Sequence, residues 1–370
     1  MKNMKNNKKR NFNLDVIRTL ALFNLISVHF LLNNNFYQTD VNGIKMYIAF
    51  FFRSCFMTCV PLFLLLTGFL MSKKKTVDKN YYKGLKKILI NYVLAILFVY
   101  IVRGIYKNES LSILEFLKLT LSYKNSAWYV NMYIGLFLLI PFLNVINLNI
   151  DKKQKKYLIL TFLILSTLPS ILNIYNFNSN NWFFCSKLKD GYDILVPNWW
   201  TSIYPLTYFF IGAYLADYKI NISKLKNILL ILLVLICSSS FNYIRSYGGK
   251  FEWAIYNEWG SIQNILSSTL TFILIINFNF DKINQNLKNI IIKISNLSFV
   301  AYLVHQVFEL IVYDLISLKT QTFYEKSVYY IPAVLSIAFL SLMSSVMIEA
   351  IYNGILKIIS KIEEKYKTNS

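Results

Sequence analysis

The fold is decided by residues 13–30, which read NLDVIRTLALFNLISVHF, an apolar run interrupted by Asp15, Arg18 and His29. A helix that spans a membrane needs about 20 largely apolar residues, so this stretch predicts a membrane helix. A charged side chain at the centre of a bilayer costs ~2.5–3.5 kcal/mol on insertion scales, and His29 is one of only two histidines in the chain. Ionisable residues in such a helix usually have a function, which makes these three the first candidates for a site.

The composition places the whole chain in the membrane class. Its 370 residues are 56% hydrophobic and 15% charged, whereas soluble domains carry about 25% charged residues. The formal net charge of +21 fits basic cytoplasmic loops as well as nucleic acid, and the positions of the lysines decide between them. The four cysteines are too few and too scattered for a disulfide framework, and no Cys/His spacing indicates a metal site.

Ten apolar segments are long enough to span a membrane, which predicts an all-α integral membrane bundle in a single domain over 1–370. The first segment is followed by LLNNNFYQ, which lacks the small-residue cleavage site of a signal peptide, so we expect it to remain as a helix. Transmembrane helices are expected within 12–354, between tails at 1–11 and 355–370. The ten segments are 12–32, 47–71, 86–106, 128–147, 157–175, 201–218, 226–244, 261–278, 295–316 and 328–354.

The lysines and arginines orient this bundle. With ten spans and a cytoplasmic N-terminus, 26 of the 39 Lys and Arg residues fall in inside segments, 10 in outside loops and three, Arg18, Arg53 and Arg103, within spans. Cytoplasmic loops of membrane proteins are enriched in Lys and Arg, and every loop follows this rule. Both termini are therefore predicted to be cytoplasmic, in a multi-pass protein of the cell membrane. Because topology explains the basic charge, no nucleic-acid partner is expected.

The tryptophans are all predicted to lie on one side of the membrane. All six fall at or beyond the predicted outer ends of helices. An aromatic belt is one explanation, although belts form at both interfaces of a membrane. The other explanation is a set of stacking surfaces for sugar rings. The six are Trp128, Trp182, Trp199, Trp200, Trp253 and Trp259.

Helical geometry relates the ionisable residues of the first helix. Arg18 and His29 are eleven residues apart, which is three turns plus about 20°, so both lie on one face and ~16 Å apart along the axis. Asp15, three residues before Arg18, can pair with it on the same face. Alternatively, Arg18 extends toward lipid headgroups and His29 is an interfacial residue.

The same stretch resembles the start of acyltransferase family 3, whose first helix carries an arginine, ten residues and a histidine, here Arg18 and His29. The resemblance covers most of the chain. Its other motifs are VPLFLLLTGFLM (60–71), AWYVNMYIGLFLLIPFL (127–143), YFFIGAYL (208–215) and ISNLSFVAYLVHQVF (294–308), the last containing Tyr302 and His305.

The resemblance implies a membrane O-acyltransferase, with acetyl the expected group, that transfers it from cytoplasmic acyl-CoA to a hydroxyl of an extracytoplasmic or lipid-linked glycan. Such chemistry needs a base for the hydroxyl proton, and a neutral histidine suits that task. We expect His29 to be this base, Arg18 to bind the donor or organise the site, and Asp15 to orient Arg18. A covalent acyl-histidine intermediate stays an alternative. No permanently bound cofactor is expected, and acyl-CoA is a substrate.

One loop departs from the family pattern. After the second helix the family often has two arginines separated by two residues, followed by a proline, whereas this chain reads YYKGLKKILINY. Lys83, Lys86 and Lys87 keep the positive charge there and are candidates for binding the donor. A lysine does not replace the bidentate contacts of an arginine with a phosphate.

Five further residues are candidates on the acceptor side: His305, Glu309, Tyr302, Arg53 and Trp128. Glu309 lies four residues after His305 and therefore on the same helix face, so this pair could line the acceptor path or relay a proton. A packing role for His305 is the alternative. Arg53 could contact an anionic acceptor, although extension of its side chain to the interface is favoured.

Two other functions fit parts of the pattern. Buried charges also line the pathways of transporters, so a polysaccharide exporter or flippase is an alternative, although neither inverted repeats nor regularly broken helices are present. The second alternative function is that of a membrane sensor, or of the recognition half of a split enzyme. Expected partners of the enzyme are acyl-CoA, a cell-surface glycan or lipid-linked saccharide, membrane lipids and glycan-assembly proteins.

Overall fold

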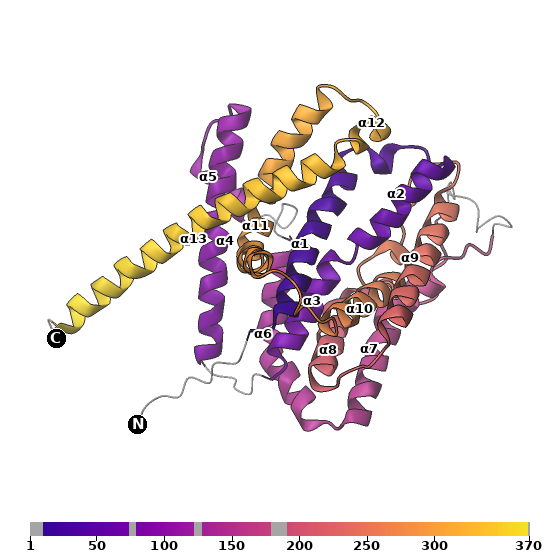
Figure 1. Ribbon diagram of the computed structural model, residues 1–370, viewed down its shortest axis with the longest axis horizontal. Helices are drawn as coiled ribbons and strands as arrows, with labels where there is room; N and C mark the ends of the chain where they lie inside the picture. The colour runs from indigo at the N-terminus through magenta and orange to yellow at the C-terminus, as the bar shows by residue number, and fades with distance from the viewer. Residues whose placement is uncertain (1–9, 74–78, 122–127, 179–190, 369–370) are drawn as a thin grey trace.

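The protein is a bundle of α-helices, described by a computed structural model over residues 10–73, 79–121, 128–178 and 191–368 (Figure 1). Within these ranges there are α-helices and short 3-10 helices and no strand, which confirms the all-α prediction. The helices are α1 (Phe12–Asn33), α2 (Gly43–Phe56), α3 (Cys59–Met71), α4 (Lys79–Lys107), α5 (Ile113–Leu121), α6 (Trp128–Asn149), α7 (Lys152–Leu172), α8 (Tyr204–Asp217), α9 (Lys224–Ser246), α10 (Ile262–Ile276), α11 (Gln285–Ser317), α12 (Phe323–Ser327) and α13 (Tyr330–Thr368), with 3-10 helices η1 (Phe36–Gln38), η2 (Asn198–Ile203) and η3 (Ile255–Asn257).

Nine helical segments in the described part of the chain are long and apolar enough to cross a membrane, so this is a multi-pass membrane protein. The expected span at 201–218 is not among the nine, because α8 has only 14 residues. With η2 before it, however, this segment runs the length of α7. At one end Asn173 donates a hydrogen bond to Asn198, and at the other Lys155 pairs with Asp217 at 2.6 Å. It is therefore a tenth traverse of the bundle.

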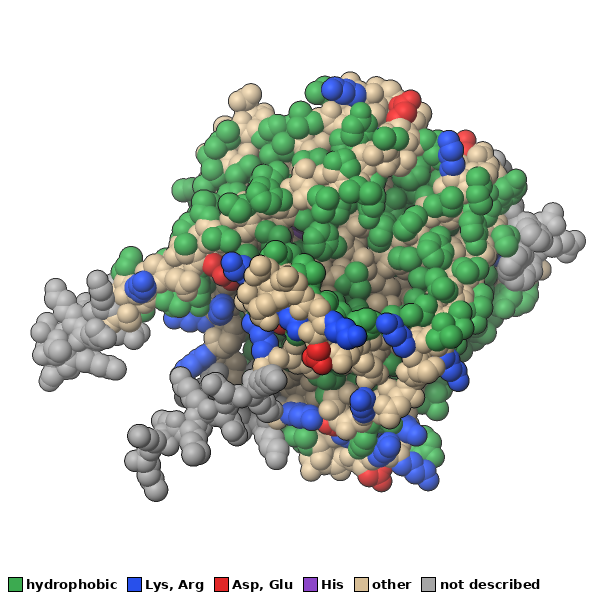
Figure 2. Space-filling view, in the orientation of Figure 1, with side chains coloured by type: hydrophobic (Ala, Val, Ile, Leu, Met, Phe, Trp, Pro, Cys, Tyr) green, Lys and Arg blue, Asp and Glu red, His purple; other side chains and the backbone are tan. Residues whose placement is uncertain are grey.

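The start of α1 and the end of α13 lie toward the same end of the bundle (Figure 1). We call this the basic end and define it by Phe12, Lys73, Lys155 and Asp217. Lys and Arg side chains gather toward this end on the face that Figure 2 shows. The opposite, tryptophan end holds His29 and all the described tryptophans, Trp128, Trp199, Trp200, Trp253 and Trp259. Trp182 lies outside the described residues.

One expected helix is wrong in detail, and one short helix was not expected. The segment 47–71 is not one helix but α2 and α3, separated at Met57 and Thr58. Pro61 lacks a backbone N–H and so cannot donate the helical hydrogen bond to the carbonyl of Met57, and the Thr58 hydroxyl accepts a hydrogen bond from Asn24 at the break. The short helix α5 was not expected, because its nine residues are too few to span a bilayer.

Helix α1 lies in the interior of the bundle, where α11, α3 and α13 pack around it. It therefore carries its ionisable side chains into the protein rather than into lipid. Next to it, α3 and α8 cross closely at two glycines. A Cβ atom at Gly68 would lie 2.1 Å from the Phe209 carbonyl oxygen, and one at Gly212 would lie 2.2 Å from that of Leu65. Small residues permit such close approach between membrane helices.

Replacement of Gly68 by alanine is expected to destabilise the protein, because the methyl group would overlap the backbone of α8. Overpacking of this kind costs about 1–3 kcal/mol, which should lower the midpoint of thermal unfolding of the detergent-purified protein by several degrees. Gly135→Ala in α6 is the matched control, since a Cβ there meets nothing within 4 Å. An equal midpoint for Gly68→Ala and the wild-type protein would contradict the crossing.

Candidate active site

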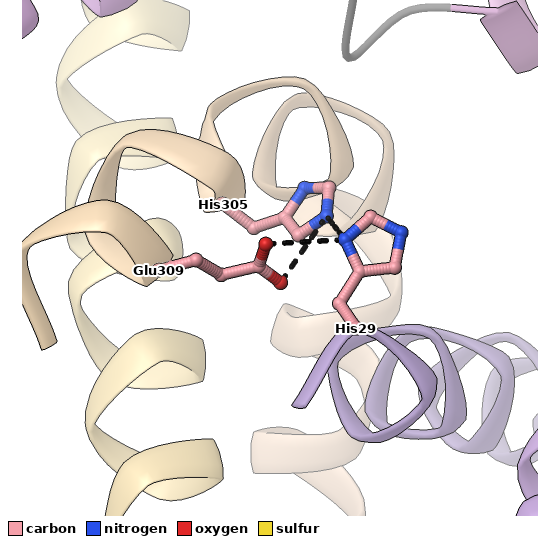
Figure 3. A group of neighbouring side chains, drawn as sticks. All are labelled: His29, His305 and Glu309. Atoms are coloured by element: carbon pink, nitrogen blue, oxygen red, sulfur yellow. Dashed lines mark hydrogen bonds and ion pairs between the residues drawn. The ribbon is translucent and has the colours of Figure 1, made fainter. Parts of the chain in front are cut away.

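Three ionisable side chains meet between α1 and α11, near the tryptophan end (Figure 3). Nδ1 of His29 lies 3.1 Å from Oε2 of Glu309 and 3.1 Å from Nε2 of His305. Nε2 of His305 lies 3.7 Å from Oε1 of Glu309. We call these three residues the His–Glu cluster. It joins both histidines of the chain, although they are 276 residues apart.

The cluster forms because α1 and α11 run in the same direction. Arg18 on α1 donates a hydrogen bond to Ser295 on α11, and farther along both helices His29 contacts Glu309. Arg18 and His29 therefore face the same neighbour, in agreement with the geometry expected from their spacing. On α11, His305 and Glu309 are one turn apart and point the same way.

The hydrogen bonds of the cluster favour one protonation pattern. Nδ1 of His305 is bonded to the backbone carbonyl oxygen of Tyr302, and because a carbonyl can only accept, this nitrogen carries a proton. Nε2 of neutral His305 is then an acceptor. Nδ1 of His29 faces two acceptors and satisfies Glu309 as a donor, which leaves the lone pair of His29 on Nε2. Figure 3 shows this second nitrogen pointing away from the cluster.

His29 is the member of the cluster that a substrate can reach. Its side chain is 16% exposed, whereas those of His305 and Glu309 are 0% and 4% exposed. Asn33, one turn after His29, also points at the Glu309 carboxylate, 3.4 Å away. This arrangement can accept a proton at His29 and stabilise the resulting charge with a buried carboxylate.

Among the described residues, the same three could hold a metal ion, since one ligand atom from each lies within 4.8 Å of the others. The donor set of two imidazoles and a carboxylate is one that zinc accepts. The sequence predicted no metal site, and that stays a prediction.

Arg18 is held by a network at the basic end of α1. Its guanidinium donates to the Ser295 hydroxyl at 2.7 Å, and Ser295 in turn donates to Asp15 at 2.7 Å. Asp15 lies 3.6 Å from Arg18, but its short contacts are two hydrogen bonds of 2.7 and 2.6 Å from Arg10. The hydrogen bond to Asp15 raises the pKa of the Arg10 guanidinium. The expected direct Asp15–Arg18 pairing is thus a weaker contact, with Ser295 as the link.

A cavity of about 250 Å³ connects Arg18 with the helix turn below the His–Glu cluster. Arg18 supplies its charge, and Tyr302, one turn before His305, lies in its wall together with Tyr129 and Tyr133. The rest of the lining is largely apolar, with Phe63, Leu66 and Leu70 from α3. A long, mostly apolar ligand with an anionic end fits such a lining, because the anion can bind Arg18.

The other donor-side candidates lie apart from Arg18. Lys83, Lys86 and Lys87 are exposed on the first turns of α4, at the basic end. The ammonium group of Lys87 lies over the ring of Tyr352, 5.8 Å from its centre. Ile88, the next residue, lines the cavity, so these lysines stand near its mouth.

Arg53 does not extend to the interface as favoured from the sequence. Its residue is only 3% exposed, and its guanidinium lies 4.4 Å from the ring centre of Phe251 and donates a hydrogen bond of 3.0 Å to the Tyr37 hydroxyl. The neighbouring rings satisfy the cation inside the protein, which apolar patterning along one helix could not show. Trp128 stacks on Trp259, with ring centres 6.1 Å apart.

Arg10, Ser295 and Asn33 also belong to the site, although they were not among the residues predicted from the sequence. Asn33 carried a usable signal, since it follows His29 by one turn on the same face. Ser295 and Arg10 carried none, because serine and a terminal arginine are ordinary residues in such positions.

A comparison with known protein families decides the relationship of this chain. A family model described as an acyltransferase domain matches residues 11–350, from the network of Arg18 to beyond the His–Glu cluster. The chain belongs to the acyltransferase 3 family. It is therefore a membrane acyltransferase, and the family supports the resemblance seen in the motifs around Arg18, His29 and His305.

The acyltransferase has curated relatives in Staphylococcus aureus. Proteins of strains Mu50, MSSA476 and N315, each named "Probable poly-beta-1,6-N-acetyl-D-glucosamine export protein", are 26% identical to it over 309 residues. The matched part covers 81% of this chain and 83% of each relative. No solved structure matches the chain.

Proposed function

We propose that this acyltransferase transfers an acyl group from cytoplasmic acyl-CoA to a hydroxyl of an extracytoplasmic or lipid-linked glycan, and that the group is acetyl. The observation that carries the proposal is the pairing of His29 with the buried Glu309 beyond a cavity that begins at Arg18. The cavity that Arg18 lines thus extends to Tyr302, one helical turn before the His305 that contacts His29.

The chemistry follows from the His–Glu cluster. As the acceptor hydroxyl attacks the thioester carbonyl, Nε2 of His29 takes its proton, and the new C–O bond forms while the C–S bond breaks. Glu309 stabilises the imidazolium through Nδ1, because the two are hydrogen-bonded in a site largely shielded from water. The proton then passes from His29 to the departing CoA thiolate, which restores the neutral base.

The basic end of the bundle is the side on which acyl-CoA would enter. It carries the charge asymmetry of a cytoplasmic face, and Lys83, Lys86 and Lys87 lie there beside the cavity mouth. Positive groups in this position attract the anionic nucleotide end of the donor. Arg18, farther inside, would hold an oxygen of the pantetheine arm or a phosphate.

The acceptor class rests on the relatives and on the tryptophan end. The name of the staphylococcal relatives concerns a polysaccharide, and a hydroxyl-bearing polysaccharide is a suitable acceptor for acyl transfer. An exposed aromatic side chain at the His29 end, that of Trp253, offers a surface on which a sugar ring can stack.

Polysaccharide export is the second candidate function, and the name of the relatives favours it. A polymer would need a wide polar passage through the bundle. The Arg18 cavity is small and largely apolar, which suits a single acyl arm better than a chain of sugars.

His29→Ala is expected to abolish label transfer from radioactive acetyl-CoA to an envelope glycan by the reconstituted protein, with a loss of at least 100-fold, since general base catalysis contributes about 10²–10⁴-fold. Glu309→Gln should lose less, because the amide can still accept a hydrogen bond from His29 but cannot balance its charge.

Further measurements separate general-base catalysis from metal-dependent catalysis and from polysaccharide export. Treatment with a metal chelator should leave transfer unchanged, whereas chelator-sensitive transfer would place a metal in the His–Glu cluster. Full transfer by His29→Ala would contradict the general-base role. Movement of glycolipid across the membrane without any label transfer would favour the exporter.

Arg18→Lys is expected to raise the KM for acetyl-CoA by about 10-fold with a smaller change in kcat, because lysine keeps the charge but loses the bidentate contact. Arg103→Lys is the matched control, since Arg103 lies on α4 and pairs at the surface with Glu109. An unchanged KM for Arg18→Lys would remove Arg18 from donor binding.

A further inference from the structure

A second recess lies at the tryptophan end, outside the His–Glu cluster and the Arg18 cavity. It has a volume of about 480 Å³ and lies between the η2 and η3 segments. Its principal lining residues are Asn198, Thr201, Ser202, Tyr204, Trp253 and Glu258. Hydroxyl, amide and carboxylate groups thus surround two large aromatic rings, a mixture that typifies ligand sites rather than lipid-facing surface.

Trp253 is an exposed ring held in a fixed position. Its ring stacks on Tyr37, with centres 4.5 Å apart and an angle of 28° between the planes, and meets Phe251 edge-on at 5.1 Å. The buried Arg53 guanidinium lies within 4.4 to 6.0 Å of the centres of all three rings. Although it is anchored in this way, the tryptophan is 62% exposed. A ring ordered beforehand loses little entropy when a ligand stacks on it.

Glu258 gives the recess its charge. Its carboxylate is the charged group of the lining. The buried guanidinium of Arg53 acts on it electrostatically, but Arg53 does not line the recess, and among the described residues no cation forms an ion pair with Glu258. A carboxylate accepts hydrogen bonds from hydroxyl groups and repels anions. The recess therefore suits an uncharged ligand with many hydroxyls and an apolar face, which is the chemistry of a pyranose ring.

The wall of the recess continues toward the acyl-transfer site. Tyr204 and Thr201 both lie against Gly260, next in the chain to Trp259. Trp259 stacks on Trp128, whose neighbour Tyr129 lines the Arg18 cavity and meets Tyr302 edge-on at 5.6 Å. Packed aromatic residues thus lead from the recess to the turn of α11 that carries His305.

We propose that this recess is a binding subsite for an uncharged pyranose unit of the acceptor glycan, with Trp253 as the stacking platform and Glu258 as the acceptor of hydroxyl hydrogen bonds. The proposal rests on the proposed function for the identity of the acceptor. It distinguishes Trp253 from Trp199, which is exposed to a similar extent, 68% against 62%, but does not line the recess.

Binding is tested without any acyl donor. The full chain in lipid nanodiscs is titrated with an uncharged oligosaccharide of β-1,6-linked N-acetylglucosamine, and the Kd is measured by equilibrium dialysis. Trp253→Leu and Glu258→Gln are each expected to raise the Kd at least fivefold. Trp199→Leu, the matched control, should stay within twofold of the wild-type protein. An oligosaccharide of uronic acids of equal length should bind at least tenfold more weakly.

Thermal unfolding of each variant establishes that it is folded. An unchanged Kd for folded Trp253→Leu, tighter binding of the uronic acid oligosaccharide, or no binding of the uncharged probe by the wild-type protein would each overturn the subsite. A different result would contradict the proposed function: a protein that binds the probe but transfers no label from acetyl-CoA.

Discussion

The contact between His29 on α1 and Glu309 on α11 is the interaction on which the site depends. It lies near one end of two parallel helices whose other end is held by Arg18, Ser295 and Asp15. A buried carboxylate without a partner would be costly, so Glu309 needs the ring nitrogen that His29 presents. The same bond leaves the opposite nitrogen of His29 free to act as a base.

The surrounding fold keeps this pair inside the protein. Helix α1 is enclosed by α11, α3 and α13, and α3 is itself drawn close to α8 by Gly68 and Gly212. Because α1 is interior, its ionisable side chains face a cavity and a partner helix instead of lipid, where they would be expensive. The bundle thus separates the guanidinium of Arg18 at the basic end from the imidazole of His29 at the tryptophan end.

Much of this architecture could be predicted from the sequence, because it depends on local spacing. The common face of Arg18 and His29 follows from an eleven-residue interval, and the alignment of His305 with Glu309 from an interval of four. The meeting of the two histidines could not be predicted, since it depends on how α1 packs against α11. The predicted position of the Arg53 side chain was wrong for the same reason, because the aromatic rings that enclose it come from distant segments of the chain. The 201–218 segment crosses the bundle only with the help of a 3-10 turn that hydropathy does not reveal.

The protonation pattern of the two histidines tests the central claim most directly. Because the chain has only two, the ¹⁵N spectrum of histidine-labelled protein at neutral pH contains two imidazole spin systems, and His29→Ala assigns them. The account predicts a proton on Nδ1 and none on Nε2 for His29. A proton on Nε2 of His29, in either the other tautomer or a stable imidazolium, would contradict its role as the base.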